Sequence, residues 1–416
     1  MLRLLALVLA LAAALPAAAA PLTLERVVLV QRHGVRPPTV GNDQLAKYAA
    51  QPWPAWPVPP GELTPHGALV VRQIGATLRA DYRRLGLLPT RGCPGAGAVS
   101  VWADGTDQRT RRSGEITAEA LAPGCGVRAA WAPPDPRDPI FSGAASPACQ
   151  TDLAQARNSI LSRAGPTGLS TPATDRALAR LQSILAPMAC SGGPGTCFRG
   201  DHAVVAGGYA GARVTGPIAE TSSLVEDLLL EYVEGMPAKD VGWGRAASPA
   251  AIAAVMPLHE RQFELTVRNP YLAGRRGALM ARLIVAALAG EANPTGQGPQ
   301  AGPATRLLAL SGHDSNLAYM GAVFGLDWAL PGQPEATAPG TTLAFEVWRD
   351  PASGARYVKP VAYYDTLTQM RALTPARAQR LPLTFNGCAS GPNGSCPLPR
   401  LRQRMEAIVP PRCGLP

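Results

Sequence analysis

Three short stretches of the chain carry side chains suited to binding and transferring a phosphoryl group. They are Arg32, His33 and Arg36 in the first stretch, Arg109 in the second, and His313 and Asp314 in the third. Guanidinium groups form charge-assisted, often bidentate bonds to a tetrahedral oxyanion and keep their charge at ordinary pH. A histidine among such cations is favoured in its neutral form and can attack phosphorus through a ring nitrogen. Together the stretches predict phosphoryl transfer through His33.

Asp314 is the available general acid for such a reaction. The alkoxide that leaves a phosphate ester is too basic to depart unless it is protonated as the P–O bond breaks. Asp314 must itself carry a proton to do this, which suits an acidic medium. The arginines and His313 can neutralise the phosphoryl oxygens without a metal ion, and no HExxH, paired-carboxylate or Walker-type motif stands out in the sequence. We therefore expect neither a metal nor a cofactor.

Each stretch follows a short apolar run that is typical of a buried strand. The runs are RVVLV at 26–30, AVSVWA at 98–103 and RLLALS at 306–311. Each run is followed by a polar, glycine-containing turn and then by a helix or loop pattern. Ligands of open α/β sheets bind outside the carboxyl ends of the strands, so we expect the three turns to meet in one crevice.

The segment between the second and third runs is different in character. From about 150 to 269 it contains helical patterns such as SLVEDLLLEYVEG and PAAIAAVMPLHERQFELTV. We therefore predict an α/β fold with two domains. A large domain, 21–150 with 270–416, holds a mostly parallel sheet flanked by helices, and a smaller, mainly helical domain is inserted at 151–269. A chain of 416 residues with 46% hydrophobic content can bury cores of that size.

The first residues, 1–20, have the layout of a secretory signal peptide. An early arginine precedes an apolar run, a proline and several small residues. The run is too short for a comfortable membrane span, and no later segment reaches about 18 uninterrupted apolar residues. We expect cleavage near residue 20 and a periplasmic or secreted protein with no membrane association; the alternative is an uncleaved anchor.

The 8 cysteines fit export to an oxidising compartment. Their even number indicates disulfides, and the absence of any CxxC pair argues against a zinc site. The short spacings of Cys190 with Cys197 and of Cys388 with Cys396 suggest two local disulfides. Spacing leaves the pairing of the other cysteines open.

The formal net charge of +10 favours anionic partners. Arginine greatly outnumbers lysine, a bias typical of GC-rich coding, so most arginines need no functional explanation. Nucleic acid is not expected as a partner, because the basic residues are scattered, aromatic residues make up only 5% and no known binding module occurs. We expect a small-molecule phosphate ester as the partner and a monomeric chain.

Longer motifs around these residues resemble those of the histidine acid phosphatases, branch 2 of the histidine phosphatase superfamily. The matching stretches are RHGVRPPT at 32–39, DQRTR at 107–111 and GHDSN at 312–316, with WPAWPV, LSRAG, EGMPAKDVGWGR and LPGQP elsewhere in the chain. The likeness is greatest to bacterial periplasmic phytases and their glucose-1-phosphatase relatives, and it covers nearly the whole mature chain. It implies a large α/β domain interrupted by a mostly helical one, with the site in the cleft between them.

The resemblance also implies roles for individual residues. His33 would form the covalent phosphohistidine, Asp314 would donate the proton, and the phosphate would be bound by Arg32, Arg36, Arg109 and His313. The cysteine positions imply the pairs Cys93–Cys125, Cys149–Cys413, Cys190–Cys197 and Cys388–Cys396.

Substrate choice depends on residues around this centre. Those expected to line the substrate pocket, by likeness to enterobacterial phytases, are Thr39, Val40, Glu226, His259 and Arg276. Gly34 and Val35 fit the phytase-type first motif. Val40, however, stands where those phytases carry a lysine that helps to hold a highly charged inositol phosphate. We expect a phytase acting on inositol hexakisphosphate, with glucose 1-phosphate or another sugar phosphate as the alternative substrate.

Two other functions share part of this pattern. A non-catalytic periplasmic protein could use the arginines to capture phosphate or a phosphate ester, but it would need no proton donor, so the His313-Asp314 pair argues against it. A phosphomutase would share the histidine chemistry, but export and disulfides do not suit that metabolic role. Taken alone, each residue has a structural explanation; Asp314, for example, could simply cap the following helix.

Overall fold

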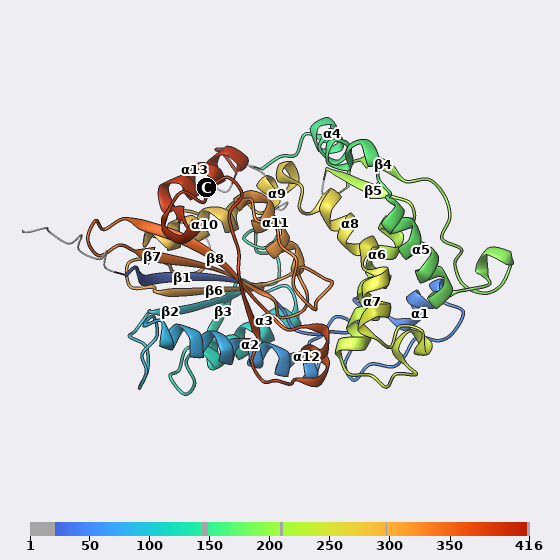
Figure 1. Ribbon diagram of the computed structural model, residues 1–416, viewed down its shortest axis with the longest axis horizontal. Helices are drawn as coiled ribbons and strands as arrows, with labels where there is room; N and C mark the ends of the chain where they lie inside the picture. The colour runs from blue at the N-terminus through green and yellow to red at the C-terminus, as the bar shows by residue number, and fades with distance from the viewer. Residues whose placement is uncertain (1–20, 144–148, 209–210, 297, 414–416) are drawn as a thin grey trace, which may run out of the picture.

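The computed structural model describes residues 21–143, 149–208, 211–296 and 298–413. The expected signal peptide, 1–20, lies outside these residues. A large sheet with helices on both faces fills one half of the molecule, and a group of helices fills the other (Figure 1). None of the described helices combines the length and the apolar character needed to cross a membrane.

The 8-stranded sheet has a parallel and an antiparallel half. In spatial order its strands are β10 (Cys396–Pro397), β8 (Arg356–Tyr364), β7 (Thr342–Arg349), β1 (Thr23–Arg32), β6 (Leu307–Gly312), β2 (Val99–Ala103) and β3 (Ala129–Trp131), and β9 (Gln379–Pro382) pairs with β8. The pairs β1–β6, β6–β2 and β2–β3 are parallel. The pairs β1–β7, β7–β8, β8–β9 and β8–β10 are antiparallel.

The α/β class expected from the sequence is confirmed, with a large sheet flanked by helices. The expectation that the sheet is mostly parallel is wrong. The short connection 350–355 joins β7 to β8, and a connection of that length makes an antiparallel hairpin, since a parallel crossover needs a dozen or more residues. The three strands predicted from the sequence are β1, β2 and β6, and all of them lie in the parallel half.

The sequence of β1 shows how one strand serves two cores. Successive side chains of a strand point to opposite faces of the sheet. Val27 and Leu29 belong to one hydrophobic core, and Val28 and Val30 belong to another. A short, uninterrupted run of β-branched residues such as RVVLV is therefore suited to a central strand that is covered on both faces.

Helices cover both faces of the sheet (Figure 1). In that view, α2 (Pro65–Arg84) and α3 (Gln108–Leu121) lie below the sheet, and α10 (Ala278–Ala289), α11 (Asp314–Phe324) and α13 (Leu398–Ile408) lie above it. The side chain of Thr64 caps α2 by accepting a hydrogen bond from the Gly67 amide at 2.8 Å. Pro65 then occupies the first helical position, where no amide donor is needed.

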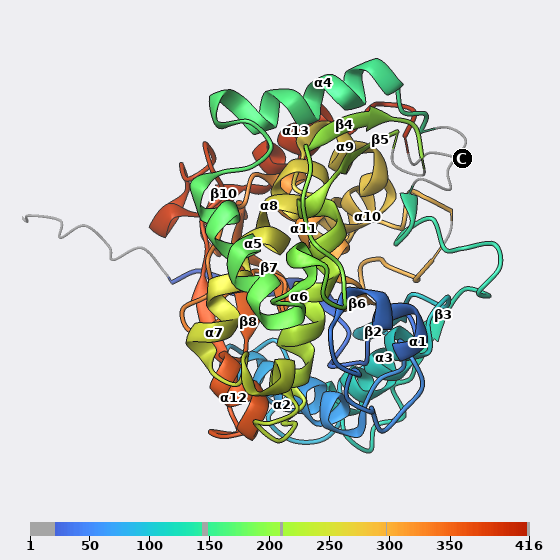
Figure 2. The ribbon, with the colours of Figure 1, turned by 90° about the vertical axis from the view of Figure 1, so that its right-hand side faces the viewer.

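Most of the remaining helices form the other half of the molecule. They are α4 (Leu153–Ala164), α5 (Pro172–Leu185), α6 (Pro217–Val233), α7 (Pro249–Val255) and α8 (Pro257–Thr266), with the antiparallel pair β4 (Ala203–Ala206) and β5 (Ala212–Thr215), and α9 (Pro270–Arg276) follows them. The helical pattern at 249–267 forms two helices, because Pro257 lacks an amide donor and begins α8 instead of continuing α7. These helices lie beyond the carboxyl ends of the parallel strands, and Figure 2, viewed from that side, shows them in front of the sheet.

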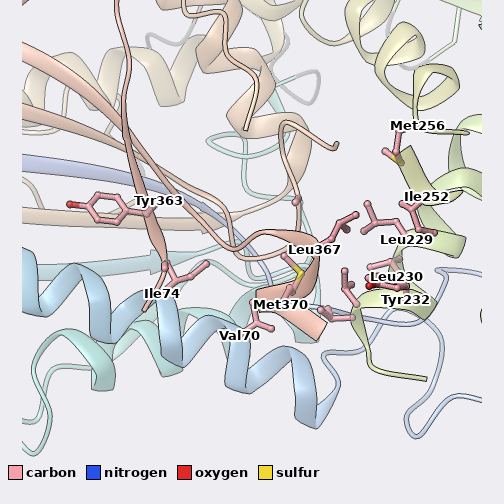
Figure 3. Packing of buried hydrophobic residues seen from close by; sticks show 14 of the residues in the cluster. Val70, Ile74, Leu229, Leu230, Tyr232, Ile252, Met256, Tyr363, Leu367 and Met370 are labelled. Carbon is pink, nitrogen blue, oxygen red and sulfur yellow. The ribbon is translucent and has the colours of Figure 1, made fainter. Parts of the chain in front are cut away.

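One hydrophobic core joins the two halves (Figure 3). Val70 and Ile74 of α2 pack near Met370, which belongs to the short helix α12 (Leu367–Ala372). On its other side, α12 contacts α6, where Leu229 is fully buried. The helical half is therefore not joined to the sheet by linkers alone.

The four disulfides implied by the family resemblance are confirmed. They are Cys93–Cys125, Cys149–Cys413, Cys190–Cys197 and Cys388–Cys396. The second of these connects the region just before α4 to the end of the described chain after α13.

Candidate active site

A cavity of about 500 Å³ opens at the carboxyl ends of the parallel strands. The predicted site residues that line it are His33, Arg36, Thr39, Arg109, Arg276, His313 and Asp314. The predicted residues that do not line it are Arg32, Val40, Glu226 and His259. The wall thus combines several cations with a histidine pair and a carboxylate, as binding and transfer of an anion require.

The register of the parallel strands brings the three predicted stretches together. Arg32 of β1 lies opposite Gly312 of β6. Just beyond the strands, the His33 amide donates to the Gly312 carbonyl at 2.9 Å, and the Asp104 amide donates to the Ser311 carbonyl at 2.9 Å. The three turns therefore begin side by side, as the sequence predicted.

His33 is buried, and its neighbours set its protonation. Its Nδ1 lies 2.8 Å from the carbonyl oxygen of Gly34, which can only accept, so in the neutral ring Nδ1 carries the hydrogen and donates it. Nε2 then keeps its lone pair. Burial, together with the charges of Arg109 and Arg32, holds the pKa of His33 well below its usual value. The neutral form of the His33 ring is therefore favoured, with the Nε2 lone pair free.

Gly34 is required by the packing next to His33. A Cβ atom at this position would lie 2.3 Å from the backbone oxygen of Gly67, at the start of α2. The nearest atom belongs to the backbone, so it cannot move aside as the end of a flexible side chain could. The close approach of α2 therefore fixes the Gly34 carbonyl that orients the His33 ring.

Arg36 and Arg109 provide two largely buried cations on the cavity wall. Arg36 donates through Nη2 to Glu226 at 3.1 Å. Arg109 donates through Nη2 to Asp107 at 3.0 Å and through Nη1 to the Gly61 carbonyl at 3.1 Å. These bonds hold both guanidinium groups in fixed orientations, which favours directed binding of an oxyanion.

Arg32 lies behind the cavity wall among carboxylates. Its fully buried guanidinium contacts Glu226 and Glu335, and its Nη2 lies 3.3 Å from Oδ2 of Asp314. Burial acts to lower the pKa of Arg32, but Glu335 and Glu226 outweigh it and raise that pKa above its usual value. For Glu226, burial acts to raise the pKa, but Arg36 and Arg32 outweigh it and hold the pKa below its usual value. Arg32 thus remains charged beside Asp314.

His313 and Asp314 lie where β6 gives way to α11. The Nε2 of His313 lies 2.9 Å from Oδ2 of Asp104, and its ring stands edge-on to that of His33 with centroids 5.6 Å apart. Burial acts to raise the pKa of Asp104, but the hydrogen bond and charge of His313 outweigh it and lower that pKa. An ionised Asp104 therefore fixes the orientation of the His313 ring.

The residues expected to line the substrate pocket fall into two groups. Thr39 and Arg276 are on the cavity wall. Val40 is 39% exposed but lies outside that wall, while Glu226 and His259 are buried behind it. These three residues do not line the cavity in this structure. For Glu226 the reason is electrostatic, because its carboxylate neutralises two buried arginines.

Sequence reasoning missed three charged residues of the wall: Asp104, Asp107 and Arg137. Asp104 directly follows β2, so the rule that singled out His33 could also have found it. Arg137 lies in the loop after β3, where no pattern distinguishes it from the many other arginines of the chain.

Asp104, Asp107 and His313 are also the described residues whose donor atoms lie close enough together to hold a metal ion, all within 4.8 Å of one another. Each of them already has a protein partner. Asp104 accepts a hydrogen bond from His313, and Asp107 pairs with Arg109. Asp104 positions the His313 ring and Asp107 positions the Arg109 guanidinium, and these two roles explain why the three residues lie close together.

The chain is similar to known proteins over most of its length. The family model described as "Histidine phosphatase superfamily (branch 2)" matches residues 23–184 and 236–362. Phytase AppA of Escherichia coli (strain K12) is 34% identical over 414 residues, which cover 95% of this chain and 94% of that protein. A glucose-1-phosphatase of Salmonella typhimurium (strain LT2) is 27% identical over 399 residues, which cover 93% of this chain and 92% of that protein.

A solved structure extends the likeness to three dimensions. The Hafnia alvei phytase in complex with myo-inositol hexakis sulphate has a TM-score of 0.84 and 32% sequence identity, and the match covers 96% of this chain and 100% of that chain. Sequence and structure thus match over both halves of the molecule. The chain belongs to branch 2 of the histidine phosphatase superfamily.

Proposed function

We propose that the protein is an acid phosphomonoesterase that hydrolyses phosphate esters through a covalent phosphohistidine on His33. The observation that carries this proposal is a neutral, buried ring whose Nδ1 is occupied by the Gly34 carbonyl, which leaves the Nε2 lone pair for phosphorus. The same cavity wall holds Arg36, Arg109 and Asp314. A binding protein would need the arginines but not a nucleophile held in this way.

In the first half-reaction, Nε2 of His33 attacks phosphorus, and an N–P bond forms as the ester P–O bond breaks. The carboxyl group of Asp314 gives its proton to the leaving oxygen. Arg36, Arg109 and His313 bind the phosphoryl oxygens and stabilise the charge that they carry in the transition state. Arg32 adds its charge from behind the wall and stabilises the Asp314 carboxylate once the proton has left.

In the second half-reaction, water attacks the phosphorus of the phosphohistidine. The Asp314 carboxylate takes a proton from this water as the new P–O bond forms. The N–P bond then breaks, inorganic phosphate leaves, and the ring of His33 returns to its neutral form. The cycle thus begins and ends with a protonated Asp314, and every proton is accounted for.

We propose inositol hexakisphosphate as the favoured substrate. The E. coli and H. alvei relatives are phytases, and the second of them was solved with an inositol hexakis sulphate. A cavity of about 500 Å³ is of the size that small-ligand sites occupy. Glucose 1-phosphate remains the alternative, supported by the S. typhimurium relative and by the absence of a cation at Val40.

We also propose export to the periplasm or beyond, and function as a monomer. The four disulfides support an oxidising compartment. The described cavity is built from residues of a single chain, so the proposed reaction needs no second copy. We keep 21–150 with 270–416 and 151–269 as the proposed division into an α/β domain and a helical domain.

The test is a side-by-side measurement of phosphate release from inositol hexakisphosphate and glucose 1-phosphate at acid pH, with and without a chelator. We expect hydrolysis that the chelator does not change and a higher kcat/KM for the inositol phosphate. Preference for glucose 1-phosphate would replace the substrate but keep the chemistry. Failure to hydrolyse any ester, or a strict metal requirement, would overturn the proposal.

A further inference from the structure

Two further arginines line the cavity and come from other elements than Arg36 and Arg109. Arg36 and Arg109 come from the turns after β1 and β2, whereas Arg276 ends α9 and Arg137 lies in the loop after β3. The question is whether these last two arginines serve the folded protein alone or an additional ligand group.

The partners of Arg276 leave part of its guanidinium unused. Its Nη1 donates to the hydroxyl of Tyr319 at 3.3 Å, and the guanidinium carbon lies 6.0 Å from the centre of that ring. Its Nη2 is buried and has no hydrogen-bond partner among the described residues. Buried donors are normally satisfied, so a donor on a cavity wall without a partner indicates a missing acceptor.

Arg137 is likewise unpaired. It is exposed at the cavity and makes no ion pair or hydrogen bond with any part of the chain that the structure describes. It is neither part of the Arg32 network nor held by a carboxylate. Its charge is therefore available to a ligand.

The segment that follows Arg137 is firmly held, so this charge has a defined place. Asp138 accepts hydrogen bonds from the Trp102 indole at 2.8 Å and from the Ile140 amide at 2.9 Å. A Cβ atom on Gly143 would lie 2.0 Å from the Arg276 backbone oxygen. The loop therefore packs directly on the end of α9 and brings both arginines to the same wall.

We propose that Arg137 completes, with Arg276, a second anion-binding subsite, and that Arg137 is a specificity-determining residue for substrates with more than one phosphate. Arg276 is already expected in the substrate pocket by likeness to enterobacterial phytases, so the new element is Arg137. This inference rests on the proposed function. One phosphate would be bound by Arg36 and Arg109 for attack by His33, and another would reach the second pair. A sugar monophosphate has no group for the second pair, so the subsite favours a polyphosphorylated ring.

The experiment measures binding of myo-inositol hexakissulfate, which carries several anionic groups that the proposed reaction cannot remove. Its Kd is determined by isothermal titration calorimetry for the wild type, for Arg137→Gln and for Arg176→Gln. Arg176 is an exposed arginine of α5 outside the cavity and serves as the matched control. Inorganic sulfate is titrated in parallel as a ligand with a single anionic group.

We expect Arg137→Gln to raise the Kd of the hexakissulfate about tenfold, a change of about 1.4 kcal/mol. The Kd of inorganic sulfate should stay at its wild-type value, and Arg176→Gln should change neither Kd. An unchanged Kd for the hexakissulfate in Arg137→Gln would overturn the subsite. An equal rise in the Kd of inorganic sulfate would also overturn it, because Arg137 would then act only through the overall positive charge of the cavity.

The calorimetry does not depend on turnover. A wild type that binds hexakissulfate but hydrolyses no ester would therefore refute the proposed function alone. A wild type that hydrolyses inositol hexakisphosphate while Arg137→Gln binds as tightly as before would refute the subsite alone.

Discussion

His33 and Asp314 face the same cavity but are positioned by different means. A single backbone carbonyl, that of Gly34, fixes the ring of His33. Asp314 begins α11 and lies within 3.3 Å of Arg32, a cation buried among other carboxylates. The nucleophile is thus oriented by the backbone of its own motif, whereas the proposed proton donor depends on side chains from several elements.

Replacement of Asp314 should affect esters according to their leaving groups. Asp314→Asn keeps the size of the side chain but cannot give up a proton, so kcat for an alkyl phosphate should fall about 10²-fold to 10⁴-fold. The first half-reaction of 4-nitrophenyl phosphate should slow much less, because its leaving group needs little protonation. Steady-state and burst kinetics on both esters check this. Equal losses of that step for the two esters would contradict the role of Asp314 as a proton donor.

The sequence was enough to predict much of the site. His33, Arg36, Arg109, His313 and Asp314 meet at one cavity, because each lies shortly after a predicted strand, either in the turn or at the start of the next helix. Positions far from these turns were harder to place. The burial of Glu226 depends on Arg32 and Arg36 reaching it across the two halves of the molecule, and no local sequence pattern encodes that contact.

At the scale of elements, α6 carries buried carboxyl groups that no cation neutralises fully. Burial, with the nearby charge of Glu226, raises the pKa of Asp227 to about 8. Burial also raises the pKa of Glu231 to about 8, although that group accepts a hydrogen bond from the Gly242 amide. Both groups are therefore protonated in the folded protein at acid pH.

These two raised pKa values predict that the stability of the protein falls as the pH rises toward 8. A raised folded-state pKa contributes stability that is fully present below the unfolded pKa and is lost as pH rises through the folded pKa. The free energy of unfolding should therefore decline between about pH 4 and pH 8. Asp227→Asn should remove part of this decline and raise the stability at pH 8 by an amount on the order of 5 kcal/mol, because the pKa of Asp227 is raised from its usual 3.8 to about 8.

Denaturant unfolding at pH 5 and pH 8 measures this difference. Asp175→Asn, at an exposed position of α5, is the matched control and should keep the wild-type dependence on pH. If the free energy of unfolding of Asp227→Asn depends on pH as that of the wild type does, the charge on Asp227 does not contribute to the pH dependence of stability.

The elements themselves were predicted unevenly. The strands β1, β2 and β6 stood out because each is a short apolar run before a polar turn. The antiparallel half formed by β7, β8, β9 and β10 was missed. These strands come from the last part of the chain, and β7 joins them to the sheet by pairing with β1 on the side opposite β6. Periodicity marks a strand, but the direction of its neighbour depends on connections that the pattern does not show.

At the scale of the whole molecule, a shared core holds the two halves together, and a long-range disulfide links two residues that are both buried in the other core, on the sheet side. The core in Figure 3 runs from α2 through α12 to α6. Cys149–Cys413 closes a loop with a sequence separation of 264 residues. The core opposes separation of the halves, whereas the disulfide holds the region before α4 to the end of the described chain after α13.

Removal of this disulfide should destabilise the protein strongly. In the chain-entropy account, a cross-link stabilises more when it closes a longer loop, so the Cys149→Ser/Cys413→Ser double variant should lose about 2–5 kcal/mol. The matched control is Cys190→Ser/Cys197→Ser, which removes a disulfide with a separation of 7 residues and should lose less. Denaturant unfolding under oxidising conditions compares the two. A larger loss in the control would show that the long-range link contributes little.

The central claim is that the phosphoryl group passes through His33. The most direct measurement mixes the enzyme with 4-nitrophenyl phosphate at acid pH, quenches the reaction in alkali within milliseconds, and maps phosphorylated peptides by mass spectrometry. The account predicts a phosphoryl group on His33 in the wild type, and neither label nor turnover in His33→Ala. Turnover by His33→Ala at the wild-type rate, or a label on another residue, would contradict it.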